Sequence, residues 1–174
     1  MIRFIALFAG ALLWAATADA HVLESTSAGL SAGFAHPFTG LDHLAAMIGV
    51  GLWAARLGGR ARWIVPGTFV GTMAIGALAG FIGGPIEAVE IVVLMSGVVF
   101  GGLVLLARSW PISWAAGLTA LFAFAHGYVH AVELPLAAAP LAYAMAFLAA
   151  TALLHAVGIL AYVAARAAVY APRM

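Results

Sequence analysis

Long apolar stretches alternate with short breaks along almost the whole chain, and each break contains Gly, Pro or Arg. A helix needs about 20 predominantly apolar residues to cross a bilayer, and most of the stretches approach or exceed that length. They predict five membrane-spanning helices, at about residues 40–55, 63–82, 86–107, 112–130 and 136–165. A short apolar run at 28–35 precedes the first of them. We therefore expect an all-α fold, a polytopic transmembrane helix bundle that residues 21–174 form as one domain.

The segment before this bundle has the three parts of a secretory signal. Arg3 provides a positive charge, residues 5–16 form a short apolar stretch, and Ala18-Asp19-Ala20 has the small residues of a cleavage site. Because this order is typical of signal peptides, we predict that residues 1–20 are a cleavable one. A retained, tilted first helix is the alternative. Cleavage would leave His21 at the mature N-terminus, where its imidazole and the free amine can chelate a metal or where it simply follows the cut.

Composition supports the membrane assignment and removes several classes of function. Apolar residues make up 66% of the chain and charged residues 7%, whereas a soluble domain has about 25% charged residues. The net charge is +1, so the chain offers no basic surface for nucleic acid. It contains no cysteine, which excludes disulfides, iron–sulfur clusters and thiol nucleophiles. A bound metal ion would need imidazole, carboxylate, thioether, backbone or water ligands.

The arginines predict the orientation of the bundle. They precede the signal segment or follow the first, third and fifth spans: Arg3; Arg56, Arg60 and Arg62; Arg108; Arg166 and Arg173. Since Lys/Arg-rich loops stay in the cytoplasm, all seven lie on one side when the mature N-terminus is outside. The signal segment requires the same orientation. We therefore expect a protein of the bacterial inner (plasma) membrane with a periplasmic N-terminus and a cytoplasmic C-terminus.

Glycines recur near four-residue spacing within the spans, which lets helix backbones approach closely in a membrane. They are Gly67, Gly71, Gly76, Gly80, Gly84, Gly97 and Gly101. This spacing favours packing inside one bundle, and a homo-oligomer through the same helix faces is the alternative.

The first group of polar residues surrounds a proline. His36 and Pro37 precede Asp42 and His43, and Met47 lies one turn beyond His43. Because proline cannot continue a helix from before it, we predict a break or kink at Pro37. Broken helices often border substrate sites in transporters, where they leave backbone carbonyls free. Met47 is a packing residue or a further ligand.

A second group lies at the end of the fourth span. His126, His130 and Glu133 follow one another at spacings of four and three, so they share one helical face. A His-x-x-x-His pair on a helix can direct both imidazoles at one ion. Glu90 near the start of the third span and His155 in the middle of the fifth are further candidates. Ionisable groups in a membrane are costly and are functional candidates by default.

The predicted topology places almost all of these groups at one level. The first and third spans begin outside and the fourth ends outside, so the candidates lie in the outer half of the membrane and His155 lies near its midplane. We therefore predict a metal site formed by His36, Asp42, His43, His126, His130, Glu133 and Glu90, with His155 as a deeper relay ligand.

Two motifs resemble the HupE/UreJ family of membrane proteins. The first is His36-Pro-Phe-Thr-Gly-Leu-Asp42-His43-Leu-Ala-Ala-Met47, and the second is Phe122-Ala-Phe-Ala-His126-Gly-Tyr-Val-His130-Ala-Val-Glu133. The second motif departs from the family where Tyr128 replaces a frequent histidine and Ala131 a frequent glycine. The family is regarded as nickel or cobalt permeases linked to hydrogenase and urease maturation. The resemblance therefore implies roles for the histidines and carboxylates of both motifs.

These observations favour a permease for a divalent transition metal, most readily Ni²⁺ and also Co²⁺, which supplies a hydrogenase or a urease. It would use no prosthetic group and would not be an enzyme. Imidazole and carboxylate ligands suit several metals and do not choose among them. One alternative is an intramembrane metal-dependent hydrolase, which would need a lateral opening to lipid. Another is an accessory membrane protein that sequesters metal without transport.

Overall fold

The computed structural model describes residues 26–106, 108–134 and 139–170, and within these ranges every regular element is a helix. The helices are Thr26–Thr39, α2 (Leu41–Leu57), α3 (Ala61–Ile82), α4 (Glu87–Leu105), α5 (Ile112–Val132) and α6 (Pro140–Tyr170). The predicted all-α fold is therefore confirmed for the described residues. The predicted signal peptide, residues 1–20, and His21 lie outside them.

Four of these helices are long and apolar enough to cross a membrane, namely α3, α4, α5 and α6. The helix Thr26–Thr39 and α2 form a bent pair that makes a fifth candidate span when the two are taken together. This agrees with the sequence-based expectation of about five spans. The first expected span differs, because α2 by itself has 17 residues and the helix before it is longer than the predicted lead-in.

The bend between these two helices lies at Gly40 and not at Pro37, where the sequence predicted it. Thr26–Thr39 continues through Pro37, and its axis then makes an angle of 82° with α2. Pro37 falls in the last turn of this short helix. Its missing N–H therefore removes only one of the last hydrogen bonds that the helix could form. Gly40 has the extended conformation, with φ −106° and ψ 127°, and this residue turns the chain.

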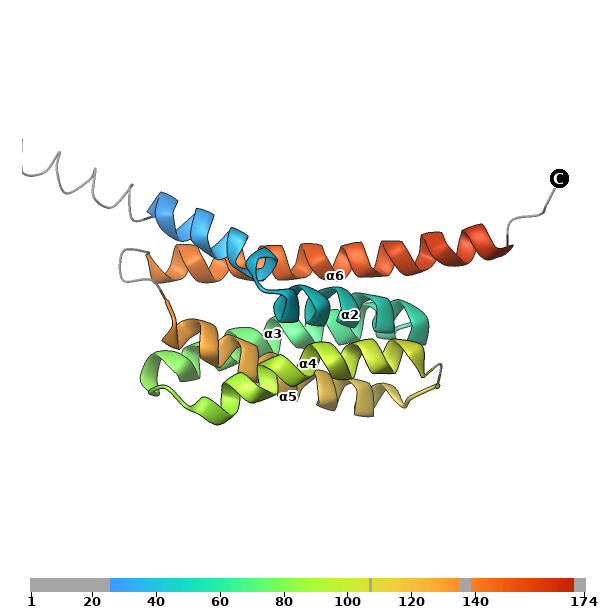
Figure 1. Ribbon diagram of the computed structural model, residues 1–174, viewed down its shortest axis with the longest axis horizontal. Coiled ribbons are helices and arrows are strands. Elements are labelled where there is room, and N and C mark those ends of the chain that lie inside the picture. The colour runs from blue at the N-terminus through green and yellow to red at the C-terminus, as the bar shows by residue number, and fades with distance from the viewer. Residues whose placement is uncertain (1–25, 107, 135–138, 171–174) are drawn as a thin grey trace, which may run out of the picture.

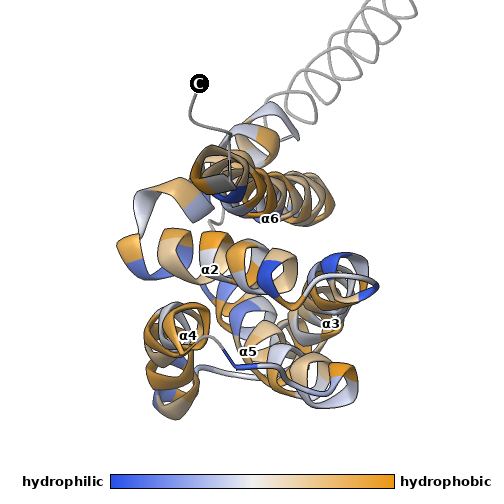
Figure 2. Ribbon diagram, turned by 90° about the vertical axis from the view of Figure 1, so that its right-hand side faces the viewer, coloured by the Kyte–Doolittle hydropathy of each residue, from blue (hydrophilic) through white to orange (hydrophobic). Residues whose placement is uncertain are grey.

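α2 lies at the centre of the bundle (Figure 2). It packs against α6 on one side and against α4 and α3 on the other, while α3 pairs closely with α5. The core between them is built from large apolar side chains that are almost fully buried, chiefly Met47, Trp53, Phe69, Met73 and Phe100. Large apolar side chains also cover the outside of the helices, as expected where lipid replaces water.

Glycine allows close helix contacts at two pairings: α2 with α6, through Gly51 and Gly158, and α3 with α5. A Cβ atom on Gly127 of α5 would collide with the backbone carbonyl of Met73 in α3. From the other side, Gly76 and Gly80 of α3 meet the α5 backbone in the same way. The small residues therefore serve packing inside the bundle here. Gly67 and Gly71 have open space around them, and a homo-oligomer through that face stays a prediction.

α6 is the longest helix, with 31 residues. At 1.5 Å per residue it is about 46 Å long, which exceeds the hydrocarbon thickness of about 30 Å. It runs along the whole bundle and extends past the other helices toward the C-terminus (Figure 1). Its first half therefore covers one end of the bundle, the end where the two polar motifs meet.

Candidate metal centre

Three histidines from three separate helices come together at this end of the bundle. His36 lies on the helix before the bend, His43 in the first turn of α2 and His130 in the last turn of α5. One ring nitrogen of each lies within 4.8 Å of one from each of the others. Two nitrogens bound to one ion at about 2.1 Å are at most about 4.2 Å apart. A shift of about an ångström would therefore let all three bind one ion.

Ring contacts show how tightly the group is packed. The ring centroid of His36 lies 4.5 Å from that of His130 and 5.7 Å from that of His43, and those of His43 and His130 lie 4.7 Å apart. Phe147 of α6 lies against both His36 and His130, at 5.8 and 4.5 Å. The histidines therefore meet one another directly and have an aromatic wall on the α6 side.

Asp42 orients the imidazole of His43. Its Oδ1 atom lies 2.8 Å from Nδ1 of His43, and a carboxylate at that position favours a proton on Nδ1. Nε2 is then left with a free lone pair, the form in which imidazole binds a metal. Gly40 leaves the space for this pair, because a Cβ atom there would lie 2.7 Å from Oδ1 and 3.0 Å from Nδ1. As the first acidic residue of α2, Asp42 also interacts favourably with the helix dipole.

His126 extends the group one turn deeper along α5. Its Nδ1 atom lies 2.9 Å from the carbonyl oxygen of Phe122, so Nδ1 carries the proton and donates it. Nε2 is therefore an acceptor, and it has no hydrogen-bond partner. The ring lies against His43 and His130, at centroid distances of 5.5 and 6.2 Å. His126 thus presents a free Nε2 lone pair beside the three-histidine group.

Unpartnered nitrogens are the main electrostatic feature of the centre. His126 is 0% and His130 3% exposed, yet Nε2 of His126 and both ring nitrogens of His130 lack a hydrogen-bond partner. A buried polar atom left without a partner costs about 1–3 kcal/mol. Several such atoms gathered at one place leave lone pairs that a bound group could use.

The predicted carboxylates have different positions. Asp42 is part of the group, through His43. Glu133 lies at its edge, with Oε2 4.0 Å from Nδ1 of His130 and its side chain 51% exposed. Glu90 is exposed on α4 and does not belong to the three-histidine group. Glu133 and Glu90 are thus accessible from outside, where carboxylates can attract a hydrated cation.

Two other candidates lie away from the group. His155 is buried on α6, two turns beyond Phe147 toward the C-terminus. Met47 is also buried, and its sulfur accepts a hydrogen bond from the hydroxyl of Thr151 at 3.4 Å. Met47 therefore has a packing partner in α6. Tyr143 and Phe147 of α6 both contact His36, and the sequence did not lead us to predict them. Their four-residue spacing, which places them on one helical face, is the feature that could have pointed to them.

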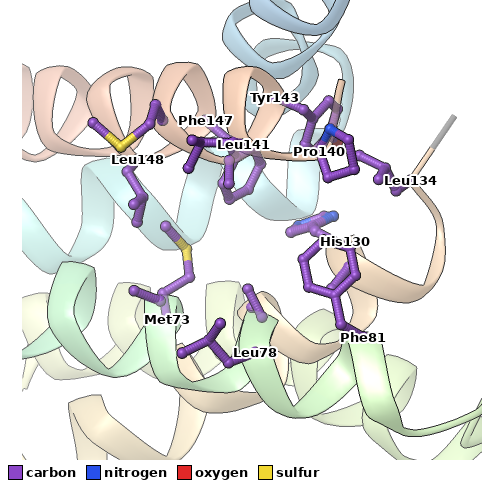
Figure 3. Close-up of a pocket in the computed structure, with 16 residues that line it drawn as sticks. Met73, Leu78, Phe81, His130, Leu134, Pro140, Leu141, Tyr143, Phe147 and Leu148 are labelled. Atoms are coloured by element: carbon purple, nitrogen blue, oxygen red, sulfur yellow. The ribbon is translucent and has the colours of Figure 1, made fainter. Parts of the chain in front are cut away.

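An apolar cavity of about 390 Å³ adjoins the centre, and His130 forms part of its wall (Figure 3). Its other walls come mainly from apolar side chains of α3 and α6, with Ala131 of α5 and Leu134 beside His130. Leu78, Phe81, Leu141 and Met145 at its rim are exposed, so the cavity opens between these two helices. The lining of the cavity is apolar apart from His130 and Tyr143, and Asp42 and Glu133 do not contribute to it.

The chain was compared with known proteins. The family model described as HupE / UreJ protein matches residues 9–173, which include every described helix and all the histidines of the centre. The chain is also similar to Protein HupE of Rhizobium leguminosarum bv. viciae, with 42% identity over 152 residues, which cover 86% of this chain and 78% of that protein. No solved structure matches it.

Proposed function

The chain belongs to the HupE/UreJ family, and from this premise we propose that it is a membrane permease for a divalent transition metal, with Ni²⁺ as its principal substrate. One observation carries the proposal. Imidazole nitrogens from three helices lie within 4.8 Å of one another, and both ring nitrogens of the buried His130 among them have no hydrogen-bond partner. Several imidazoles with nearby carboxylates suit Ni²⁺ and Co²⁺.

The sequence of events follows from the position of each group. Glu133 and Glu90 attract the hydrated ion at the exposed edge, and Asp42 adds negative charge beside His43. His36, His43 and His130 then replace water ligands, with His126 next to them on the inner side. Neutral imidazoles hold the ion without neutralising its charge, which keeps binding weak enough for release.

The proposal includes the setting in the cell. The protein lies in the bacterial inner membrane with the three-histidine group on the periplasmic side and the arginines in the cytoplasm. The sequence contains no nucleotide-binding motif, so the ion moves down its own gradient or with a membrane gradient. The imported metal supplies the maturation of a hydrogenase or a urease.

Uptake of radioactive nickel into proteoliposomes tests this function. Wild-type protein should accumulate nickel, and His43→Ala should not. Ser31→Ala is the matched control, because Ser31 is exposed on the neighbouring helix and bonds only to the carbonyl of Ala28 in its own helix. Equal uptake by wild type and His43→Ala would exclude the proposed site from transport.

The apolar cavity favours a second candidate, an intramembrane metal-dependent hydrolase. The cavity opens toward the lipid between α3 and α6 and reaches His130, so an acyl chain there would bring a lipid ester near a metal-bound water. Filling the cavity with Ala77→Phe distinguishes the two. A permease retains nickel uptake in this variant, whereas a hydrolase loses its turnover of liposomal lipid. Metal binding without either activity would indicate the sequestering accessory protein.

A further inference from the structure

A second set of unpartnered polar atoms lies deeper in the bundle than the three-histidine group. His155 of α6 is 1% exposed, and neither of its ring nitrogens has a hydrogen-bond partner. Thr119 of α5, seven residues before His126 on the same helical face, is 0% exposed and its hydroxyl is also unpartnered. Around them the core is apolar. Burying polar groups without hydrogen-bond partners in an apolar core costs free energy. Their presence here therefore requires an explanation.

Phe69 of α3 connects this deeper region to the outer one. Its ring centroid lies 5.4 Å from that of His126 and 5.0 Å from that of His155. The ring of Phe69 is therefore in contact with both imidazoles. His126, which touches His43 on its outer side, is the only histidine of the described chain that contacts both the outer group and Phe69.

Helix geometry gives the depth of each step. Along α5, His126 precedes His130 by four residues, or about 6 Å. Along α6, His155 follows Phe147, which lies against His130, by eight residues, or about 12 Å. α5 runs outward and α6 inward, so both displacements point away from the three-histidine group toward the arginine end. The imidazoles thus follow one another at increasing depth.

We propose that His126 and His155 form an inner station for a divalent transition metal ion, which is distinct from the three-histidine group and lies beside the ring of Phe69. The inference rests on the proposed function and adds a second binding position to it. His126 takes the ion from His43 and His130 through Nε2, and His155 receives it on the inner side of Phe69. Thr119 lies seven residues, or about 10 Å, beyond His126 toward the arginine end of α5.

A packing role for His155 fits the structure less well. A buried histidine kept for packing normally donates one ring proton to a carbonyl or a side chain. His155 has neither contact, and its ring meets that of Phe69 at an angle of 81°. Leucine at this position would pack without any unsatisfied nitrogen, so its polar ring is explained by a ligand.

A single introduced thiol tests the station directly, because the chain has no cysteine. Purified His155→Cys protein in detergent is titrated with Co²⁺, whose bond to a thiolate gives a charge-transfer absorption band that imidazole ligands do not give. The band should appear in His155→Cys and be absent from Leu154→Cys, a matched control whose side chain is also buried. Adding His126→Leu to His155→Cys should weaken the Co²⁺ affinity of the band by about tenfold or more.

The outcomes separate this inference from the proposed function. Co²⁺ absorption from the outer histidines without a thiolate band in His155→Cys would overturn the inner station and leave the outer site intact. A band of equal strength in Leu154→Cys would overturn it as well. Should His155→Cys not fold, His155→Leu serves instead: it should lose one bound ion per chain and most nickel uptake while keeping the outer absorption. Unchanged stoichiometry and uptake would mean that His155 is a packing residue.

Discussion

The imidazoles of His36 and His130 lie with their ring centroids 4.5 Å apart and their planes at 74°, although three helices separate the helix of His36 from α5 along the chain. The contact does not come from interactions inside either helix. Each is placed by packing: His36 by the bend at Gly40, and His130 by the close fit of α5 against α3. The following predictions test what this arrangement does.

Replacing His36 by alanine should weaken Ni²⁺ binding by more than about 100-fold, because one of three ligands is lost while the other two stay in place. Isothermal titration of the purified protein measures the effect. Ser31→Ala on the same helix should bind as the wild type does. An unchanged affinity in His36→Ala would show that the nitrogens of His43 and His130 bind the ion without it.

Asp42→Asn should lower the affinity for Ni²⁺ by about 10- to 100-fold, the usual effect of losing a carboxylate that orients a ligating histidine. The side chain keeps its size but no longer carries the charge that favours a proton on Nδ1 of His43. Glu87→Gln removes a carboxylate at the exposed start of α4 and should change the affinity by less than about twofold. Similar losses in both variants would indicate a general effect of negative charge.

Gly40→Ala should weaken metal binding by about tenfold with little change in thermal stability. The added Cβ would lie 2.7 Å from Oδ1 of Asp42, so this carboxylate must move away from His43, whereas the backbone conformation of Gly40 is accessible to alanine. Gly84→Ala, in a loop with open space, is the control. A stable Gly40→Ala variant with full affinity would refute the orienting role of the Asp42–His43 pair.

Gly127→Ala should destabilise the protein by about 1–3 kcal/mol, seen as a fall of several degrees in the melting temperature. The new methyl group meets the carbonyl of Met73, which belongs to a helix backbone and has little freedom to move. Gly117→Ala on the same helix has open space and should be neutral or slightly stabilising, since alanine favours the helix. Equal melting temperatures for the two variants would contradict the α3–α5 contact.

The orientation can be tested with single cysteines in the cysteine-free chain. Gly84→Cys, between α3 and α4, should react with a membrane-impermeant maleimide in spheroplasts, whereas Ser109→Cys, between α4 and α5, should react only after permeabilisation. Both positions are exposed. The reverse pattern would place the three-histidine group in the cytoplasmic half and turn the proposed import into export.

Much of the fold followed from hydropathy, because lipid requires nearly every residue of a spanning helix to be apolar. The bounds of α3 and α5 agree with the predicted spans to within two residues. The bend was misplaced, because the effect of Pro37 depends on its distance from the helix end, which local sequence does not show. The predicted span at 136–165 likewise differs from α6, which begins at Pro140 and continues to Tyr170.

The candidate site was predictable as a list of residues but not as a geometry. Spacing placed His126 and His130 on one face, and the structure has them so. Spacing could not show that His36 meets His130 or that Glu90 stays apart from the group, since these relations depend on how separate helices pack. The place of Phe69 between His126 and His155 has no local signal either, because it is one of many aromatic residues in an apolar span.

The corner at Gly40 has a mechanical consequence for selectivity among ions. His36 lies four residues, or about 6 Å, from this corner, so opening or closing the 82° angle by about ten degrees moves its imidazole by roughly an ångström. A movement of this size is enough to bring nitrogens that lie within 4.8 Å of one another to the spacing of about 4.2 Å or less that one bound ion requires. In the proposed permease, the torsion angles of one backbone residue that carries no ligand would thus control how closely His36 approaches the other two histidines.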